Sequence, residues 1–437
     1  MSVKQSLRDL EQRVRLALVR PLRIKLAARK RAQAPGVFIG ITGSSGKSST
    51  TDLISAVLRK KGSVTTQLMN NTIHPLINTI RNSGKSDFVV VENGVGEKGV
   101  MKPMASLLQP DIAVVTMVGL EHYSAFRSSE AIAEEKGWLV ESLRPEGLAV
   151  LNADDPLVMG MARRTSARVL TFGYSEDADC RIVKVEGGAP SGIVVTLSYR
   201  GQELVIPTKY AGHHFAASVA AATIVGMQLG VTVEDLRDAI GSCSPVVLRL
   251  STHQIAGGPL IIADCAKAPL GTLHLAFDAL RHVDAPRKRI VLGQVSDYIG
   301  SRMKAYRTAF GGALAVADEL IVVTDRSRPE RFLPRDDKGT QRFKHCLNTR
   351  EAAEYLAATA IEGEVILLKG SPNFHLERIL INFQQPVRCW EESCGRGGNC
   401  FSCGMAGFDF QSHRPIARKR RRRRFLGKLF GRKIQEA

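Results

Sequence analysis

Short apolar runs alternate with longer amphipathic stretches along most of this chain. From Val37 onward the runs are rich in Val, Ile and Leu, and the stretches between them repeat apolar residues at helical spacing. This alternation predicts a parallel sheet covered by helices. The first expected strands lie at 37–42, 63–68, 87–92, 111–116 and 148–151, with helices near 47–60, 73–82 and 128–143.

The pattern changes after residue 167 and the alternation returns later in the chain. Residues 168–208 have a β-rich pattern, and 213–229 form an alanine-rich helical stretch. A new alternation begins near Val246 and runs to about residue 385, which predicts a second, smaller doubly wound unit. Its expected strands lie at 259–263, 288–292, 319–323 and 364–368.

The two ends of the chain differ from its middle. Residues 2–31 have the pattern of a basic amphipathic helix interrupted near Pro21, and the chain after Pro386 has no core pattern. A length of 437 residues predicts two or three domains. The expected divisions are a basic arm at 1–35, a larger α/β domain at 36–245, a smaller one at 246–385, a cysteine-rich segment at 386–410 and an arginine-rich tail at 411–437.

The net charge of +19 is concentrated at these ends. Residues 1–35 contribute +8 and residues 411–437 contribute +10, which leaves the middle nearly neutral. We see neither an apolar stretch of the roughly 18 residues that a membrane helix needs nor a signal peptide, so the cytoplasm is the expected compartment. For the basic ends, an anionic membrane surface at the inner face, nucleic acid or another polyanion, and a solvated tail are all open interpretations.

A phosphate-binding loop is predicted where Gly43-Ser-Ser-Gly-Lys-Ser48 follows the first apolar run and opens a helical stretch. Phosphate oxygens bind backbone N–H groups at a helix N-terminus when small side chains leave those groups accessible. In such a loop Lys47 lies along the β- and γ-phosphates, and the Ser48 hydroxyl is a ligand of Mg²⁺. The common P-loop formula has another glycine where Ile41 stands, so only the shorter G-x-x-G-K-[ST] form fits. A glycine-rich turn with an incidental lysine is the alternative.

This shorter loop resembles the ATP site of the Mur ligases and of their relatives folylpolyglutamate synthetase, poly-γ-glutamate synthetase and the ligase part of cyanophycin synthetase. Further segments match in the same order over roughly residues 37–380. The resemblance implies an α/β fold with a P-loop parallel-sheet ATPase domain followed by a smaller Rossmann-like domain. The matching segments are 87–97 with Glu92, 110–122 with His122, 134–137 with Lys136, 151–155 with Asn152 and Asp154, Leu248-Arg249-Leu250, 264–269 with Asp264, and Lys369-Gly370-Ser371.

The same resemblance implies ATP and Mg²⁺ as cofactors and gives each residue a role. Lys136 matches the lysine that many Mur ligases carbamylate, and a carbamate there would be an anionic metal ligand. Taken alone, each of these residues is explained equally well as an ordinary polar residue without a functional role. Catalytic roles fall to Lys47, His122, Lys136 and Arg249; nucleotide contacts to Gly43, Ser44, Ser45, Gly46, Lys47, Ser48, Ser49, Asn152, Asp154, Arg249 and Asp264; and Mg²⁺ contacts to Ser48, Glu92 and His122.

Three positions depart from the family pattern. Met117 stands where asparagine is usual, Lys267 replaces a histidine, and Phe215 stands where an asparagine helps to hold adenine, which leaves the nucleotide preference open. Only a basic arm stands where ligases acting on UDP-linked sugars carry a substrate domain. This departure favours a peptide, a polymer or a small acid as the substrate.

The expected function is an ATP-dependent amide ligase. Such an enzyme activates a carboxylate as an acyl phosphate and joins it to an amino acid or another amine, releasing ADP and phosphate. One alternative is an ATP-binding scaffold recruited to membrane or nucleic acid by the basic ends, and another is a P-loop NTPase or kinase with no amide product. The set of Glu92, His122, Lys136 and Arg249 favours the ligase, because a pure binding protein does not need it.

Four cysteines crowd into the C-terminal region, at Cys389, Cys394, Cys400 and Cys403. Four thiolates are the number of ligands in a tetrahedral Zn²⁺ site. In a long chain without a secretion signal, such a cluster favours metal or redox chemistry over structural disulfides. The spacing is irregular, so free thiols are the alternative to zinc.

Overall fold

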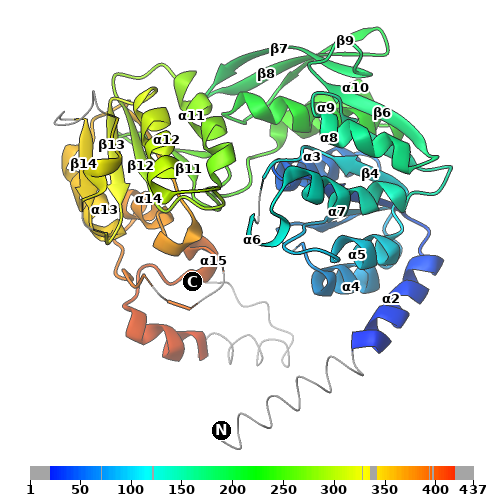
Figure 1. Ribbon diagram of the computed structural model, residues 1–437, viewed down its shortest axis with the longest axis horizontal. Coiled ribbons are helices and arrows are strands. Elements are labelled where there is room, and N and C mark those ends of the chain that lie inside the picture. The colour runs from blue at the N-terminus through cyan, green and yellow to red at the C-terminus, as the bar shows by residue number, and fades with distance from the viewer. Residues whose placement is uncertain are drawn as a thin grey trace, which may run out of the picture. The chain divides into compact units, whose positions relative to one another are not determined.

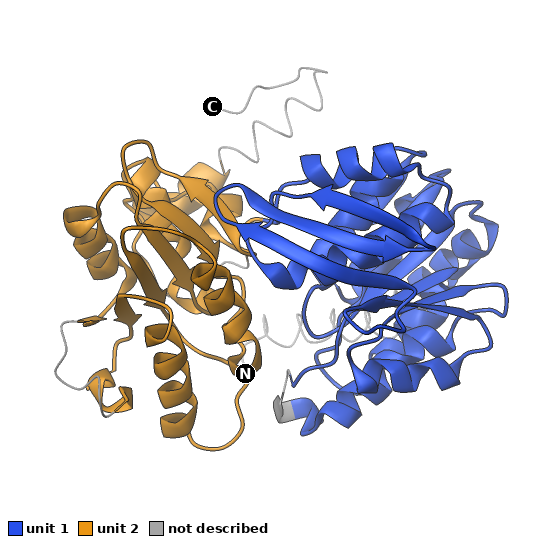
Figure 2. Cartoon of the chain, turned by 90° about the horizontal axis from the view of Figure 1, so that it is seen from above, with its two compact units in different colours: residues 1–246 blue, residues 247–437 orange. Residues whose placement is uncertain are grey.

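A computed structural model describes residues 20–69, 71–120, 123–326, 328–334, 342–392, 394–395 and 398–418 (Figure 1). The chain divides into two compact units, residues 1–246 and residues 247–437 (Figure 2). Most of the arginine-rich tail and the first half of the basic arm lie outside the described residues.

The first unit is built on a nine-stranded sheet with the order β2-β3-β1-β4-β5-β6-β7-β8-β9. Strands β1 to β6 pair in parallel, and β7 to β9 form an antiparallel meander at one end. The strands are β1 Val37–Thr42, β2 Val64–Gln67, β3 Phe88–Glu92, β4 Ile112–Val115, β5 Leu148–Asn152, β6 Arg168–Gly173, β7 Cys180–Gly188, β8 Gly192–Tyr199 and β9 Gln202–Pro207.

Helices cover this sheet, as Figure 1 shows. Strands β3, β4 and β5 are buried along their whole length, which explains why they are continuous apolar runs without alternation. The alanine-rich helix α9 is buried over most of its surface, because small side chains let a helix pack closely on a sheet. The helices are α2 Arg20–Gln33, α3 Lys47–Leu58, α4 Ile73–Asn82, α5 Met101–Leu108, α6 Tyr123–Phe126, α7 Ser129–Glu141, α8 Pro156–Met159, α9 Ala216–Gln228 and α10 Val233–Ser242, with 3₁₀ turns η2 Gly160–Arg164 and η3 His213–Phe215.

The described part of the basic arm, helix α2, packs on the first unit, with Ala27 in its core and Arg31 buried against it. The Arg31 guanidinium is buried, donates to the Leu108 carbonyl at 2.7 Å and pairs with Asp111 at 3.1 Å. It also lies over the Phe38 ring, 3.9 Å from its centroid. Burial lowers the pKa of Arg31, and the Asp111 carboxylate opposes that shift. The helix includes Pro21, and the residues before Arg20 lie outside the described part of the chain.

The second unit is a six-stranded sheet with the order β10-β11-β15-β12-β13-β14. All pairs are parallel except β10 with β11. The elements are β10 Ser251–Gln254, β11 Leu260–Asp264, α11 Leu273–Arg281, β12 Lys288–Leu292, α12 Arg302–Leu314, β13 Glu319–Val323, β14 Phe343–Cys346, α13 Thr349–Thr359, β15 Val365–Lys369, α14 Glu377–Gln384 and α15 Cys400–Cys403, with 3₁₀ turns η4 Leu270–Thr272, η5 Pro329–Phe332, η7 Pro372–Phe374 and η8 Phe410–Ser412.

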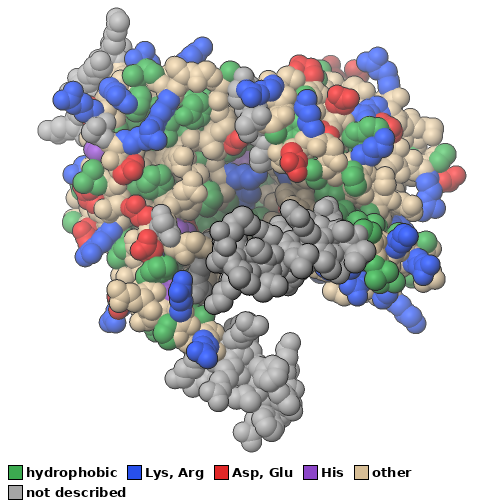
Figure 3. Space-filling model, turned by 60° about the horizontal axis from the view of Figure 1, so that its bottom comes forward, with side chains coloured by type: hydrophobic (Ala, Val, Ile, Leu, Met, Phe, Trp, Pro, Cys, Tyr) green, Lys and Arg blue, Asp and Glu red, His purple; other side chains and the backbone are tan. Residues whose placement is uncertain are grey.

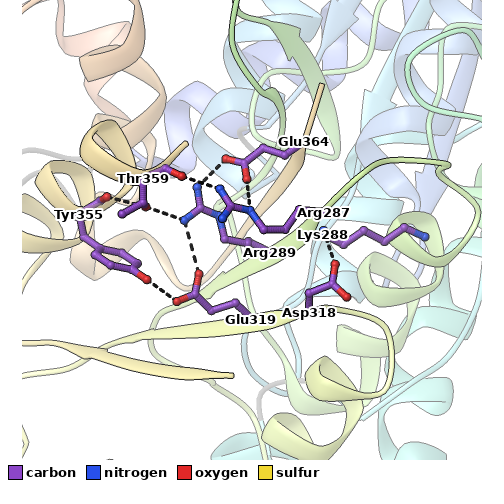
Figure 4. A network of polar contacts seen from close by, with 8 residues as sticks. All are labelled: Arg287, Lys288, Arg289, Asp318, Glu319, Tyr355, Thr359 and Glu364. Carbon is purple, nitrogen blue, oxygen red and sulfur yellow. Dashed lines mark hydrogen bonds and ion pairs between the residues drawn. The ribbon is translucent and has the colours of Figure 1, made fainter. Parts of the chain in front are cut away.

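A buried ion-pair network joins the amino ends of three strands in the second unit (Figure 4). Arg289 and Glu364 are both fully buried and paired with each other, and Arg287 pairs with the second oxygen of Glu364 at 2.6 Å. Arg289 also reaches Glu319 at 3.4 Å, and Glu319 accepts a hydrogen bond from the Tyr355 hydroxyl. Because this network lies at the opposite end of the strands from their carboxyl ends, its role is structural.

The α/β prediction is confirmed, with a P-loop parallel-sheet unit followed by a smaller α/β unit. Each predicted strand agrees with an observed one to within one residue at either end, and the β-rich stretch resolves into β6 to β9, whereas β10 and β14 were not predicted. Basic and acidic side chains are interspersed on the face drawn in Figure 3, as expected for a nearly neutral body. In the described residues, no helix combines the length and the apolar character that crossing a membrane requires.

Candidate functional site

The predicted phosphate loop lies between β1 and α3, at the carboxyl edge of the first sheet. Gly43 has φ 147° and Gly46 has φ 79°, values that favour glycine. A Cβ atom on Gly43 would lie 1.9 Å from the Thr116 hydroxyl oxygen. The loop therefore requires glycine at Gly43 both for its backbone conformation and for its close approach to the end of β4.

Ser48 and Glu92 meet beside this loop. Glu92 ends β3, which is the parallel neighbour of β1, and it accepts a hydrogen bond from the Ser48 hydroxyl at 2.9 Å. The carboxylate also accepts from the Met69 backbone N–H at 3.0 Å and from the Asn71 amide at 3.4 Å. Both Ser48 and Glu92 are buried. A hydroxyl and a carboxylate side by side are oxygen ligands of the kind that Mg²⁺ takes, so these residues fit the metal.

Two lysines converge on one carbonyl group of the loop. The Lys47 ammonium donates to the Gly43 carbonyl oxygen at 2.5 Å, and the Lys136 ammonium donates to the same oxygen at 3.1 Å. Lys136 lies on α7 and is fully buried. Both ammonium groups therefore lie beside the loop that is expected to hold the phosphates.

The ends of β4 and β5 support the loop from behind. The Thr116 hydroxyl donates to the Ser45 carbonyl at 2.5 Å, and the Asn152 amide donates to the Thr116 carbonyl at 2.7 Å. Ser44 is held by Gly119, whose carbonyl accepts from the Ser44 hydroxyl at 2.8 Å. Asn152 therefore supports the loop through Thr116.

Other predicted residues of the first unit have different surroundings. The Asp154 carboxylate accepts backbone N–H groups from Tyr174 and Ser175, in the turn after β6. Phe215 is buried against Tyr210, with ring centroids 4.5 Å apart, so the structure places it in the core. His122 lies outside the described residues. The proposed roles of Asp154 and His122 stay predictions.

In the second unit, two of the predicted segments meet at the carboxyl edge of the sheet. Asp264 ends β11 and is in register with Lys369, which ends β15. The Lys369 ammonium pairs with the Asp264 carboxylate at 2.5 Å and donates to the Lys267 carbonyl at 2.9 Å. The Ser371 backbone N–H donates to the Gln294 carbonyl at 3.1 Å, which fixes the loop after β15.

Arg249 lies in a strained turn at the start of the second unit. The leucines on either side of it, Leu248 and Leu250, are buried and have φ values of 63° and 52°. Such left-handed conformations are unfavourable for leucine and persist only where packing imposes them. The Nε atom of Arg249 is buried without a hydrogen-bond partner. The turn thus holds a guanidinium whose hydrogen-bonding capacity is partly unused.

A cavity of about 310 Å³ opens at the carboxyl ends of β12 and β13. Arg302, Asp325 and Arg326 contribute charged side chains to its lining, and Tyr298 and Phe374 contribute aromatic ones. The crevice outside the carboxyl ends of parallel strands is where α/β sheets usually bind ligands. Its size is at the lower end of the range for small-molecule sites.

The four clustered cysteines line one small cavity of about 10 Å³, together with His375, which follows η7. The Cys394 sulfur lies 3.6 Å from Nε2 of His375, and the Cys400 sulfur lies 3.6 Å from Nδ1 of the same ring. Burial raises the pKa of the Cys400 thiol to about 12. No disulfide joins the described cysteines.

Several residues at these sites were not predicted from the sequence. Asn93, directly after Glu92, is fully buried, and neither its amide nitrogen nor its carbonyl oxygen has a hydrogen-bond partner. A polar residue directly after a buried strand was the available signal for Asn93. Thr116 has the same signal after β4, whereas nothing in the local sequence links His375 to the cysteines.

The fold and the first site have the features of a P-loop protein, because a glycine loop opens a helix beside a buried hydroxyl and a buried carboxylate. Residues 41–226 match the family model of the Mur ligase middle domain. The matched residues include the phosphate loop, Glu92 and Lys136.

Curated relatives and solved structures agree with this family. The chain is 31% identical over 268 residues to UDP-N-acetylmuramoyl-tripeptide–D-alanyl-D-alanine ligase of Mycobacterium tuberculosis, covering 60% of this chain and 52% of that protein. It is 24% identical over 370 residues to the enzyme of that name from Escherichia coli, covering 84% and 80%. The crystal structure of the MurF ligase from Thermotoga maritima in complex with ADP matches with a TM-score of 0.73 and 22% identity, covering 83% of each chain. The chain spans about half the length of the mycobacterial relatives that it matches.

Proposed function

We propose that this chain is an ADP-forming ligase that activates a carboxylate as an acyl phosphate and joins it to an amine. The observation that carries the proposal is the Ser48–Glu92 pair, 2.9 Å apart beside a glycine loop that opens a buried helix. The names of the relatives, which are ligases of peptides and amino acids, support the same reaction class. An ADP complex of a protein with this fold supports the nucleotide.

The residues of the first unit would bind and neutralise the phosphates of ATP. Backbone N–H groups at the start of α3 and the Lys47 ammonium would stabilise the negative charge that develops on the departing ADP during phosphoryl transfer. Ser48 and Glu92 would hold Mg²⁺, which supplies positive charge next to the transferred phosphoryl group. Arg249, whose Nε has no hydrogen-bond partner among the described residues, matches the arginine that the family uses at the γ-phosphate and would contribute a further positive charge.

Lys136 would act as an anion after carbamylation. Lys136 is fully buried and donates to the same Gly43 carbonyl oxygen as Lys47, so its side chain reaches the phosphate loop. Conversion to a carbamate would add an anionic metal ligand beside this loop. Activity that falls after removal of dissolved CO₂ and returns with bicarbonate is the expected result, and activity independent of bicarbonate would contradict it.

The amine would bind in the 310 Å³ cavity of the second unit. The cavity has the size for an amino acid or a short peptide, and its lining presents carboxylate and guanidinium groups that complement an amine and a carboxylate. An amino acid or dipeptide therefore fits better than a large acceptor. The cytoplasm, the expected compartment, supplies both such amines and ATP.

The decisive experiment is a screen for ADP release with pairs of acids and amines. We expect release only when an acid and an amine are both present, and we expect Lys47→Ala to abolish it. Lys98→Ala, an exposed lysine close to the same edge, is the control that should keep full activity. Equal release without acid and amine would identify a plain NTPase and overturn the ligase.

We also propose one structural Zn²⁺ ion at Cys389, Cys394, Cys400 and Cys403. All four cysteines line the same cavity, which is about large enough for a single small ion or water molecule. Elemental analysis of the purified full chain tests this, with one zinc per chain as the expected result. A chain without zinc would contradict it.

Recruitment to an anionic surface through the basic ends is the second candidate. Helix α2 exposes Leu22 and Leu26 among its lysines and arginines, a composition that suits an anionic membrane or another polyanion. Cosedimentation with phosphatidylserine vesicles and with nucleic acid tests it. Equal sedimentation with neutral vesicles would contradict an electrostatic attachment.

A further inference from the structure

The cysteine-rich segment packs against the loop that follows β15. Cys400, at the start of α15, donates its backbone N–H to the Glu377 carboxylate at 2.9 Å, and its sulfur accepts from Nε of the buried Arg378 at 3.2 Å. Both Glu377 and Arg378 belong to α14, which directly follows this loop. The segment also contributes to a small apolar cluster, and its Trp390 and Phe401 pack against the core of the second unit.

His375 lies at the centre of this contact. Its Nδ1 atom is 3.3 Å from the Glu377 carboxylate, which favours the tautomer with the proton on Nδ1. The lone pair of Nε2 is then free, and Nε2 faces the Cys394 sulfur at 3.6 Å. A carboxylate behind a histidine is the usual way in which a metal-binding imidazole is oriented.

The distance between Nε2 and the Cys394 sulfur matches that of two ligands of one zinc ion. Zinc lies about 2.3 Å from sulfur and about 2.0–2.1 Å from imidazole nitrogen, and a tetrahedral angle then separates the two ligand atoms by about 3.6 Å. In the described residues, the one group of three ligand atoms within 4.8 Å of one another is His375, Glu377 and Cys400, whose close contacts are at the other ring nitrogen, Nδ1. The geometry around His375 therefore resembles one side of a metal site.

The same segment and the same loop both reach the 310 Å³ cavity. Asn373 and Phe374, just before His375, line it, and so does Glu392, which lies between Cys389 and Cys394. A metal that joined His375 to the cysteines would fix both sides of this contact at once. One wall of the cavity would then depend on the metal.

We propose that His375 binds the zinc ion through Nε2 and takes one of its four coordination positions in place of one of the four cysteines, so that the metal clamps the cysteine-rich segment to the loop after β15 and fixes one wall of the cavity. The inference rests on the proposal that the cysteines hold zinc. It goes beyond that proposal because the metal then shapes the cavity in which the amine would bind.

Cobalt substitution of the full chain tests the ligand. The d–d absorption of Co²⁺ depends on the number of sulfur and nitrogen ligands, so we expect the spectrum to change in His375→Ala and zinc affinity to fall at least tenfold. Cys346→Ser, which replaces a buried cysteine of β14 in the same unit, should change neither. An unchanged spectrum and affinity in His375→Ala would overturn the clamp while leaving a four-cysteine zinc site intact.

Hydrogen exchange on the wild-type chain tests, without any substitution, whether the metal fixes this wall of the cavity. After zinc is removed by a chelator, peptides covering 372–376 and 387–406 should exchange at least tenfold faster, and peptides of β13 should not change. Faster exchange in 387–406 alone would overturn the clamp. A purified chain that contains no zinc, or that contains iron and absorbs visible light, would instead overturn the underlying zinc proposal.

Discussion

Replacement of Glu92 by glutamine isolates the proposed metal ligand, because it removes a charge and almost no volume. In the wild type the carboxylate accepts hydrogen bonds from the Ser48 hydroxyl and the Met69 N–H, and it is only 3% exposed. Glutamine keeps one acceptor oxygen but turns a donor toward groups that are themselves donors. We expect Glu92→Gln to fold, with a loss of about 1–3 kcal/mol in the free energy of unfolding.

The effect on nucleotide binding is of similar size to this loss and is separable from it, because it is seen only when ligand is present. Ligand present at 100 times its dissociation constant stabilises a protein by about 2.7 kcal/mol. In a unit of this size each kcal/mol raises Tm by about 2–4 °C, so Mg·ATP should raise Tm by about 5–11 °C. If loss of the carboxylate weakens binding about 100-fold, the same ligand concentration stabilises by about 0.4 kcal/mol, or about 1–2 °C.

Thermal unfolding with Mg·ATP, with ATP plus EDTA, and without ligand measures both effects. Glu97→Gln is the matched control, since it removes an exposed carboxylate from the loop that follows the same strand. We expect Glu97→Gln to keep the full Mg·ATP shift and Glu92→Gln to lose most of it. A Glu92→Gln protein with the wild-type shift would refute the assignment of Glu92 to the metal.

Three further outcomes follow from the described contacts. Gly43→Ala should abolish the Mg·ATP shift, because its Cβ would collide with a neighbouring hydroxyl, whereas Gly96→Ala, with open space around it, should retain the shift. Glu364→Gln should destabilise the second unit by about 3–5 kcal/mol in urea unfolding, because it removes the buried carboxylate that pairs with both Arg287 and Arg289, and the exposed Glu362→Gln should stay within about 0.5 kcal/mol of wild type. Burial and a hydrogen bond to a carboxylate raise the pKa of Tyr355 to about 12. Its contribution to stability is therefore complete below about pH 10 and lost as the pH rises towards 12, and Tyr355→Phe should lose less stability over that window.

The elements that position the first site were predictable because they rest on local patterns. The strand at 37–42, the turn from Gly43 to Ser48 and the strand ending at Glu92 carry their own signals in apolar runs and glycine spacing. Parallel pairing then brings their carboxyl ends together, whatever the details of packing. For this reason the contact between Ser48 and Glu92 could be anticipated without coordinates.

The remaining features depend on contacts between distant segments. The four-residue strand β14 includes Lys344 and His345, so its sequence has no continuous apolar run. It is recognised as an edge strand only by its pairing with β13. The clustering of the cysteines favoured metal or redox chemistry but did not point to the histidine beside them, which lies in a different element. Likewise the sequence places Asn93 directly after a buried strand, but the lack of partners for its side-chain amide among the described residues emerges only from the structure.

The turn around Arg249 has an energetic consequence for any anion that meets it. Two leucines in left-handed conformation cost about 1–3 kcal/mol each, an amount that the packing of the second unit already supplies when the chain folds. A guanidinium held in this way loses little conformational entropy on binding, so more of its attraction to a phosphate remains as net affinity. Arginine on a relaxed surface loop would have to be ordered anew in each catalytic cycle.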